Sequence, residues 1–70
     1  MTKEEFLAEI QQVIENRPTW ARKGQAVFNH VDEKYGVART AQFSHGKDCF
    51  YNDNYIPDFV ECCWQLIEGA

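Results

Sequence analysis

Apolar side chains at helical spacing near the start of the chain constrain the fold more than any other feature of these 70 residues. A stripe of this kind lets one face of a helix enter a hydrophobic core. Its members are Phe6, Leu7, Ile10, Val13 and Ile14. Thr2 and Glu5 match a capping box, in which each side chain bonds the backbone amide of the other residue. Pro18 stops the pattern, because the residue before a proline is pushed out of the helical region. A first helix is therefore predicted between Thr2 and Pro18.

A second stripe predicts a helix that has Thr19 as its N-cap and runs to about Tyr35. Its apolar face consists of Trp20, Val27, Val31 and Tyr35, with Phe28 beside it. Gly24 lies within this helix, where a glycine costs about 1 kcal/mol relative to alanine. We therefore expect another backbone or an aromatic ring to pass close over Gly24. Gly36 supplies a left-handed C-cap.

The rest of the chain predicts one short helix, a turn and a last helix. Val37, Ala38 and Ala41 fit one face of a two-turn helix, and Gly46 suits a positive φ within residues 44–48. The last helix follows Asn54 or Tyr55 and has Pro57 in its first turn. Its stripe consists of Ile56, Phe59, Val60, Cys63, Leu66 and Ile67. We predict a single all-α domain over residues 1–70, a bundle of three main helices plus one short helix and an irregular aromatic loop.

Residues 48–59 fit no periodic pattern, because aromatic, amide and carboxylate side chains are crowded around one proline. We interpret this block as a structural clasp that ties an irregular loop to the second helix. Asp53 or Asn54 is expected to cap the last helix. Phe50 and Tyr51 are expected to fold back onto the first two helices. The amides of Gln25 and Asn29, four residues apart on one helix face, are expected to bond the backbone of residues 49–54.

Two motifs carry a resemblance. They are Gly24-Gln25-Ala26-Val27-Phe28-Asn29 and Asp48-Cys49-Phe50-Tyr51-Asn52-Asp53, the latter followed by Ile56-Pro57-Asp58-Phe59. In this order they resemble small bacterial and prophage-encoded proteins with a Gly-Gln-Ala-x-Phe-Asn motif and an Asp-Pro-Phe-Tyr-x-Asp motif before an Ile-Pro-x-Phe helix. The similarity spans roughly residues 4–67. Cys49 stands where that pattern has proline, and Asn52 and Asn54 take positions that are often acidic. The resemblance implies a helical fold and an origin on a mobile element, and it implies no activity.

Charge and cysteine content narrow the function classes. Eleven acidic against seven basic side chains give a net charge of −4, which argues against nonspecific nucleic-acid binding through clustered bases. The sequence has no signal-peptide pattern and no apolar run of membrane-spanning length, so we expect a cytoplasmic protein with reduced thiols.

Three kinds of reactive site compete with structural roles for these residues. His30, His45, Cys49, Cys62 and Cys63 are possible zinc ligands, but Cys62 and Cys63 point about 100° apart on a helix, and we favour a core role for Cys63 with Cys62 at its margin. Asp48, Asp53 and Asp58 lack the order of a calcium-binding loop. Catalysis by Cys49 is disfavoured because Asp48 raises its pKa, and His30 is expected on the solvated surface. We predict no enzyme activity, no cofactor and no bound metal.

The function that these patterns favour is a small protein-interaction module, an adaptor or inhibitor encoded on a mobile element. Acidic charge and surplus aromatic side chains suit docking onto a basic protein partner. The expected partner-binding residues are Trp20, Gln25, Asn29, Tyr51, Asn52 and Tyr55. Trp64 is a further candidate anchor. The alternative is a helical DNA-associated regulator, and a metal-binding protein comes third.

Overall fold

Helices account for nearly all of the regular structure in the computed structural model, which describes residues 1–69. The α-helices are α1 (Lys3–Glu15), α2 (Lys23–Tyr35), α3 (Ala38–Ser44) and α4 (Ile56–Glu68), and a single 3₁₀ turn, η1 (Asp53–Tyr55), precedes α4. No strand is present within residues 1–69. The predicted all-α class is confirmed. The 3₁₀ turn η1 was not predicted, and it lies in the region that the sequence predicts as an irregular loop.

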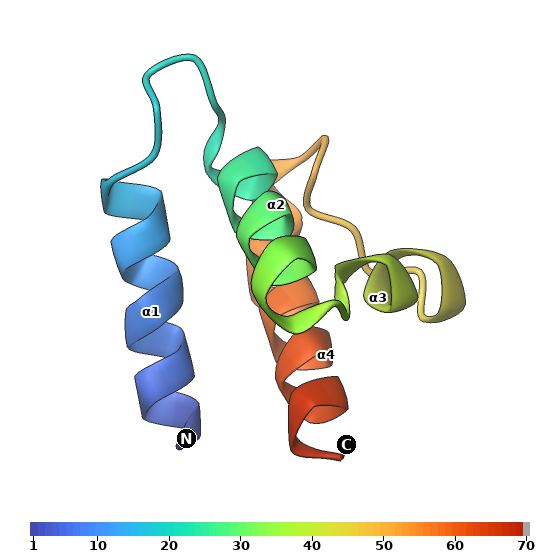
Figure 1. Cartoon of the computed structure of the whole chain (residues 1–70). Coiled ribbons are helices and arrows are strands. Elements are labelled where there is room, and N and C mark those ends of the chain that lie inside the picture. The colour runs from blue at the N-terminus through green and yellow to red at the C-terminus, as the bar shows by residue number, and fades with distance from the viewer. Residues whose placement is uncertain (70) are drawn as a thin grey trace.

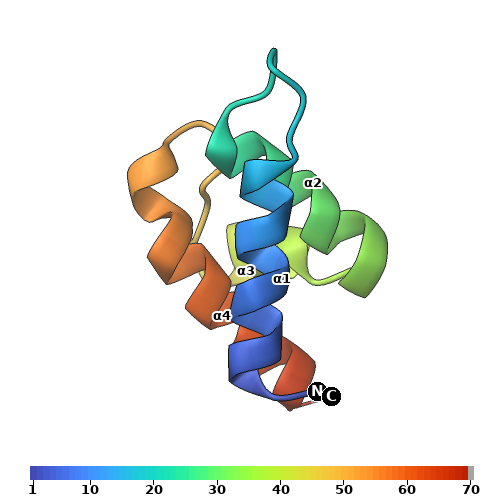
Figure 2. The same ribbon diagram turned by 90° about the vertical axis from the view of Figure 1, so that its left-hand side faces the viewer.

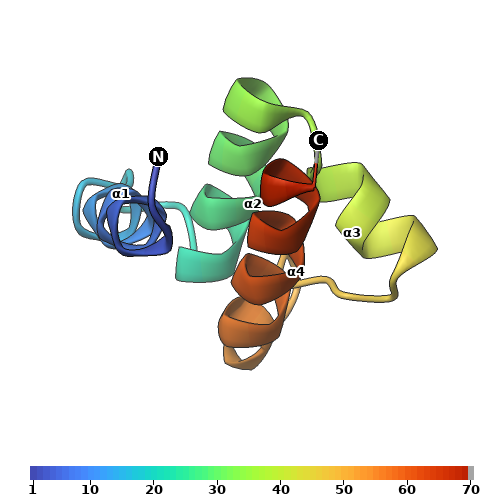
Figure 3. The same cartoon turned by 90° about the horizontal axis from the view of Figure 1, so that it is seen from below.

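The helices pack around a central pair formed by α2 and α4. Seen from below, with α1 viewed end-on, α2 and α4 lie side by side, with α1 on one flank and α3 on the other (Figure 3). The N-terminus and the last turn of α4 lie at the same end of the molecule, and the loop after α1 lies at the opposite end (Figures 1 and 2). The segment that leads into α4 also lies toward that opposite end.

The predicted start of α1 is confirmed in atomic detail. The Thr2 hydroxyl accepts a hydrogen bond from the Glu5 amide at 3.1 Å, and the Glu5 carboxylate accepts one from the Thr2 amide at 2.6 Å. Phe6 and Ile10 are buried, but Leu7 is half exposed. The inward face of α1 is therefore narrower than the predicted stripe.

The predicted start of α2 is wrong, because the helix begins at Lys23 and not after Thr19. Thr19 and Trp20 lie in a turn that the Ala21 amide closes on the Pro18 carbonyl at 3.0 Å. The Arg17 guanidinium fixes this turn by donating to the carbonyls of Ile14 and Ala21. Ala21 is buried, whereas Trp20 is 75% exposed and takes no part in the core stripe.

Aromatic rings link the helices in the core. Phe6 of α1 stacks on Trp64 of α4 with ring centroids 5.6 Å apart, and Phe28 of α2 stacks on Phe59 of α4 at 5.5 Å. Trp64 is 91% buried, so its candidacy as a partner anchor is wrong. Phe50 packs edge-on against Phe28 at 5.4 Å and extends this core into the irregular loop.

Two glycines and a proline act as predicted. Gly36 ends α2 with φ of 70°, and Gly46 has φ of 67° after α3. Pro57 lies in the first turn of α4, where a missing N–H costs no helical hydrogen bond. The predicted capping of α4 by Asp53 or Asn54 is wrong: the N-cap is Tyr55, and it makes no side-chain capping bond.

Candidate functional site

Residues 48–55 are bound to the N-terminal end of α2 by three hydrogen bonds. The Cys49 thiol donates to the Gly24 carbonyl at 3.3 Å, and the Arg22 guanidinium donates to the Phe50 carbonyl. The Gly24 amide donates to the Asp53 carboxylate at 2.9 Å. Because α2 has no side-chain cap of its own, Asp53 satisfies one of its orphan amides from a distant part of the chain. The predicted clasp is confirmed, with Asp53 capping α2 in place of α4.

The close approach expected over Gly24 is also confirmed, and it is a backbone contact. A Cβ atom added at Gly24 would lie 1.9 Å from the carbonyl oxygen of Cys49. No real Cβ tolerates such a distance, so only glycine lets the loop lie this close to α2.

The expected role of Gln25 and Asn29 in this clasp is wrong. Within residues 1–69 neither side chain forms a hydrogen bond to residues 49–54. Gln25 is half-buried and Asn29 is exposed. Arg22 and Gly24, which precede Gln25 in the chain, form the hydrogen bonds to the loop instead. Phe50 folds back onto α2 as expected, but Tyr51 does not, since it is 75% exposed.

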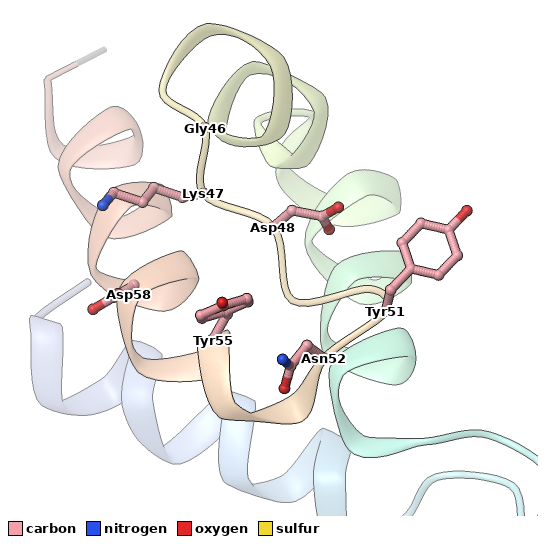
Figure 4. A pocket seen from close by; sticks show the side chains of 7 residues that line it. All are labelled: Gly46, Lys47, Asp48, Tyr51, Asn52, Tyr55 and Asp58. Atoms are coloured by element: carbon pink, nitrogen blue, oxygen red, sulfur yellow. The ribbon is translucent and has the colours of Figure 1, made fainter.

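The clasp leaves a groove between the loop and the start of α4, which we name the tyrosine groove (Figure 4). Its volume is about 410 Å³. It is lined by Gly46, Lys47, Asp48, Tyr51, Asn52, Tyr55 and Asp58. The Tyr55 ring lies between Asn52 and Asp58, and the Tyr51 ring extends away from the groove toward solvent (Figure 4). This groove brings together three of the six predicted partner-binding residues.

Two polar side chains of the tyrosine groove, Asp48 and Asn52, accept hydrogen bonds from other residues of the chain. The Asp48 carboxylate accepts hydrogen bonds from the Phe50 amide at 2.8 Å and from the Gln42 side chain at 2.9 Å. The Asn52 side chain accepts from the Asn54 amide at 2.9 Å and so caps η1. Lys47, Tyr55 and Asp58 form no side-chain hydrogen bond or ion pair within residues 1–69, so they can contact a ligand.

Trp20 and Asn29 do not line the tyrosine groove. They line a second hollow of about 390 Å³ beside the loop between α1 and α2, together with Arg17 and Pro18. Gln25 lines neither hollow. The six predicted residues therefore do not line a single hollow.

The three cysteines are unsuited to nucleophilic chemistry. Burial, with a smaller contribution from the Asp48 charge, raises the pKa of the Cys49 thiol to about 12. Burial likewise raises the pKa of Cys63 to about 12 and raises that of the half-buried Cys62. All three thiols are free, and Cys63 lies in the core with Cys62 at its margin, as the sequence predicts. In the described part of the chain, no three His, Cys, Asp or Glu side chains gather as a metal site would require.

A polar cluster between α1 and α2 was not predicted from the sequence. Glu9 of α1 accepts hydrogen bonds from His30 at 2.6 Å, Lys34 at 3.0 Å and Tyr35 at 2.9 Å. Burial raises the pKa of the Glu9 carboxyl, but the three hydrogen bonds outweigh burial and hold this pKa below its ordinary value. His30 is thus half-buried and paired, which corrects its expected place on the solvated surface. The only local signal was the spacing of His30 and Lys34, four residues apart on one helix face.

Neither a protein-family model, nor a curated protein, nor a solved structure matches this chain. Among residues 1–69, no helix combines the length and apolar character needed to cross a bilayer.

Proposed function

We propose that this chain is a small protein-interaction module that binds a partner protein through one end of the molecule. The surface comprises residues 16–23 and 48–58, which we name the loop end. It lies at the opposite end of the molecule from the N-terminus and the last turn of α4 (Figures 1 and 2). The proposed role is that of an adaptor or inhibitor encoded on a mobile element and acting in the cytoplasm.

One observation carries the proposal: large aromatic side chains are exposed on the loop end although the core does not need them. Trp20 and Tyr51 are each 75% exposed, and Tyr55 is 53% exposed. Tyrosine and tryptophan dominate the binding energy of protein interfaces because they bury large areas and retain a polar group. The turn that Arg17 fixes and the clasp on α2 hold these side chains on ordered backbone, which reduces the entropy lost on binding.

Binding is favoured over catalysis and over DNA recognition by the same structure. The Cys49 thiol is buried, and burial together with the charges of Asp48 and Asp53 raises its pKa to about 12, so it offers no activated nucleophile. The exposed acids of α4, Asp58 and Glu68, are unsuited to a recognition helix against phosphates, and α4 contains no Lys or Arg.

Affinity capture from host lysate with three versions of the protein tests this proposal. The wild type, a Tyr51→Ser/Tyr55→Ser variant and a Phe43→Ser variant are each attached through the N-terminus, which lies away from the loop end. Phe43 is a matched control, because it is 76% exposed but lies on α3. We expect a partner protein that wild type and Phe43→Ser retain equally and that the double variant loses by about tenfold or more.

The captured partner is then purified and its binding is measured directly by calorimetry. Equal affinity for all three versions, or the absence of any stoichiometric partner, would overturn the proposal.

A further inference from the structure

The ion pairs of the described residues involve no side chain of the loop end. Within residues 1–69 they join Lys3 to Glu61, His30 and Lys34 to Glu9, and Arg39 to Asp32. The loop end holds six other charged side chains, none of which forms an ion pair in the described part of the chain. They are Arg17, Arg22 and Lys23 on one segment, and Asp48, Asp53 and Asp58 on the other.

The two segments of the loop end have opposite charge. Residues 16–23 contain three bases and no acid, and residues 48–58 contain three acids and no base. Lys47, immediately before the acidic segment, lies on the side of the tyrosine groove where Asp58 also lies (Figure 4) and reduces the local negative charge by one. The segments adjoin each other, because Arg22 bonds Phe50 and Gly24 bonds Asp53.

Two adjoining patches of opposite charge form a surface that is complementary to itself. A two-fold axis that lies in the contact plane, along the boundary between the two segments, places the basic segment of one copy on the acidic segment of the other. The same contact covers Trp20, Tyr51 and Tyr55, which are the exposed aromatic side chains of these segments. A partner with a single sign of charge would match only one of the two segments.

We infer that the partner of the loop end is a second copy of this chain, in a symmetric dimer that pairs residues 16–23 with residues 48–58. This inference rests on the proposed function, since it names the partner of the same surface. The two shorter dimensions of the molecule are 25 and 20 Å, so one end offers less than the ~800 Å² per partner of a standard interface. The dimer is therefore weak, with a dissociation constant in the micromolar range or above.

Sedimentation equilibrium over a wide range of protein concentration tests the dimer. At low salt the average mass rises from 8.2 kDa toward twice that value, and high salt shifts the equilibrium back to the monomer. A chain that remains monomeric at about millimolar concentration and low salt overturns the inference.

Charge reversal identifies the surface involved. Lys23 and Asp58 are the appropriate positions, because both side chains are exposed and neither forms a hydrogen bond within residues 1–69. Lys23→Glu and Asp58→Lys each place like charges together twice in the symmetric dimer, so each weakens self-association by about tenfold or more. Glu68→Lys, at the end of the molecule that holds the N-terminus, is the matched control that leaves self-association unchanged.

Mixing the two reversed variants gives the sharpest result. Each repels its own copies, but together they pair opposite charges at both contacts, so native mass spectrometry detects the heterodimer in excess over both homodimers. The inference is overturned if Lys23→Glu and Asp58→Lys leave self-association unchanged, or if the mixture contains no excess of heterodimer.

The two proposals fail in different ways. A monomeric chain that retains another protein through Tyr51 and Tyr55 overturns the dimer and leaves the proposed function standing. A chain that dimerises as described and retains no other protein supports the dimer and overturns the adaptor or inhibitor role.

Discussion

At the residue scale, the contact between Gly24 and Cys49 determines where the irregular loop lies. The Cys49 carbonyl occupies the space that a side chain at residue 24 would fill, and the Cys49 thiol donates to the Gly24 carbonyl. A backbone oxygen cannot move aside as the end of a flexible side chain can. The missing Cβ is therefore required by a contact 25 residues away along the chain.

Replacement of Gly24 by alanine should destabilise the fold although it improves helix propensity. Alanine gains about 1 kcal/mol in a helix interior, but displacement of a packed backbone costs more, and we expect a net loss of about 2 kcal/mol. Urea denaturation followed by circular dichroism measures this loss. Lys23→Ala, at the exposed neighbouring position, should change stability by less than about 0.5 kcal/mol. A Gly24→Ala protein as stable as wild type would show that the loop can move away from α2.

The cysteines should differ in reactivity in the order of their burial. Alkylation at pH 8 followed by mass spectrometry should modify the half-buried Cys62 first. Cys49 and Cys63 should stay unmodified in the native protein, because both are buried and the pKa of each thiol is about 12. In denaturing urea all three should react at similar rates. Native Cys49 reacting as fast as Cys62 would contradict the clasp.

At the scale of elements, α2 depends on a cap that its own sequence does not supply. Its N-cap, Arg22, makes no capping bond, and the Asp53 carboxylate accepts the Gly24 amide in its place. The negative charge also complements the positive end of the α2 dipole. One side chain thus stabilises α2 and joins the first residue of η1 to it.

Asp53→Ala should cost about 1 kcal/mol of stability, the usual range for loss of an N-cap, and should speed hydrogen exchange of the Gly24 amide. Asp53→Asn keeps an acceptor oxygen and should cost less. Asp58→Ala provides the control, since the exposed Asp58 accepts no hydrogen bond within residues 1–69. Equal stability of the Asp53→Ala and Asp58→Ala proteins would exclude the capping role.

The contrast between α1 and α2 shows how far sequence patterns predict such elements. The start of α1 depends on Thr2 and Glu5, three residues apart, so the local pattern predicts it correctly. The same kind of pattern fails for α2, because Arg17 and the buried Ala21 stabilise a turn where Thr19 offers a cap. Within the candidate site, the pattern identified Tyr51, Asn52 and Tyr55. The pattern did not predict the hydrogen bond from the Gly24 amide to the Asp53 carboxylate, because no local periodicity encodes a contact across 29 residues.

At the scale of the whole molecule, α1 is held by both apolar and charged contacts. Phe6 packs on Trp64 and on Tyr35, and Glu9 accepts hydrogen bonds from three side chains of α2. The Lys3 ammonium also bonds the Glu61 carboxylate of α4. The ionised form of Glu9 therefore contributes to the docking of α1 on the rest of the bundle.

Stability should fall in acid partly through Glu9. The folded state lowers the pKa of Glu9, so its contribution is complete above the ordinary glutamate pKa of ~4.3 and is lost as pH falls through the lowered value. Urea denaturation between pH 7 and pH 3 should show a shallower loss for Glu9→Gln than for wild type. Glu4→Gln, on the exposed face of the same helix, should retain the wild-type dependence. An unchanged dependence in Glu9→Gln would rule out this contribution.

The bond between Asp53 and Gly24 also has a consequence for the order in which the chain folds. While the protein is being synthesised, α2 emerges before residues 49–53 exist, so its first turn lacks its acceptor and its glycine faces open solvent. The N-terminal half alone therefore cannot reach the native arrangement. We expect the α1–α2 hairpin to remain loosely formed until η1 closes on it, so that folding is completed late and in one cooperative step.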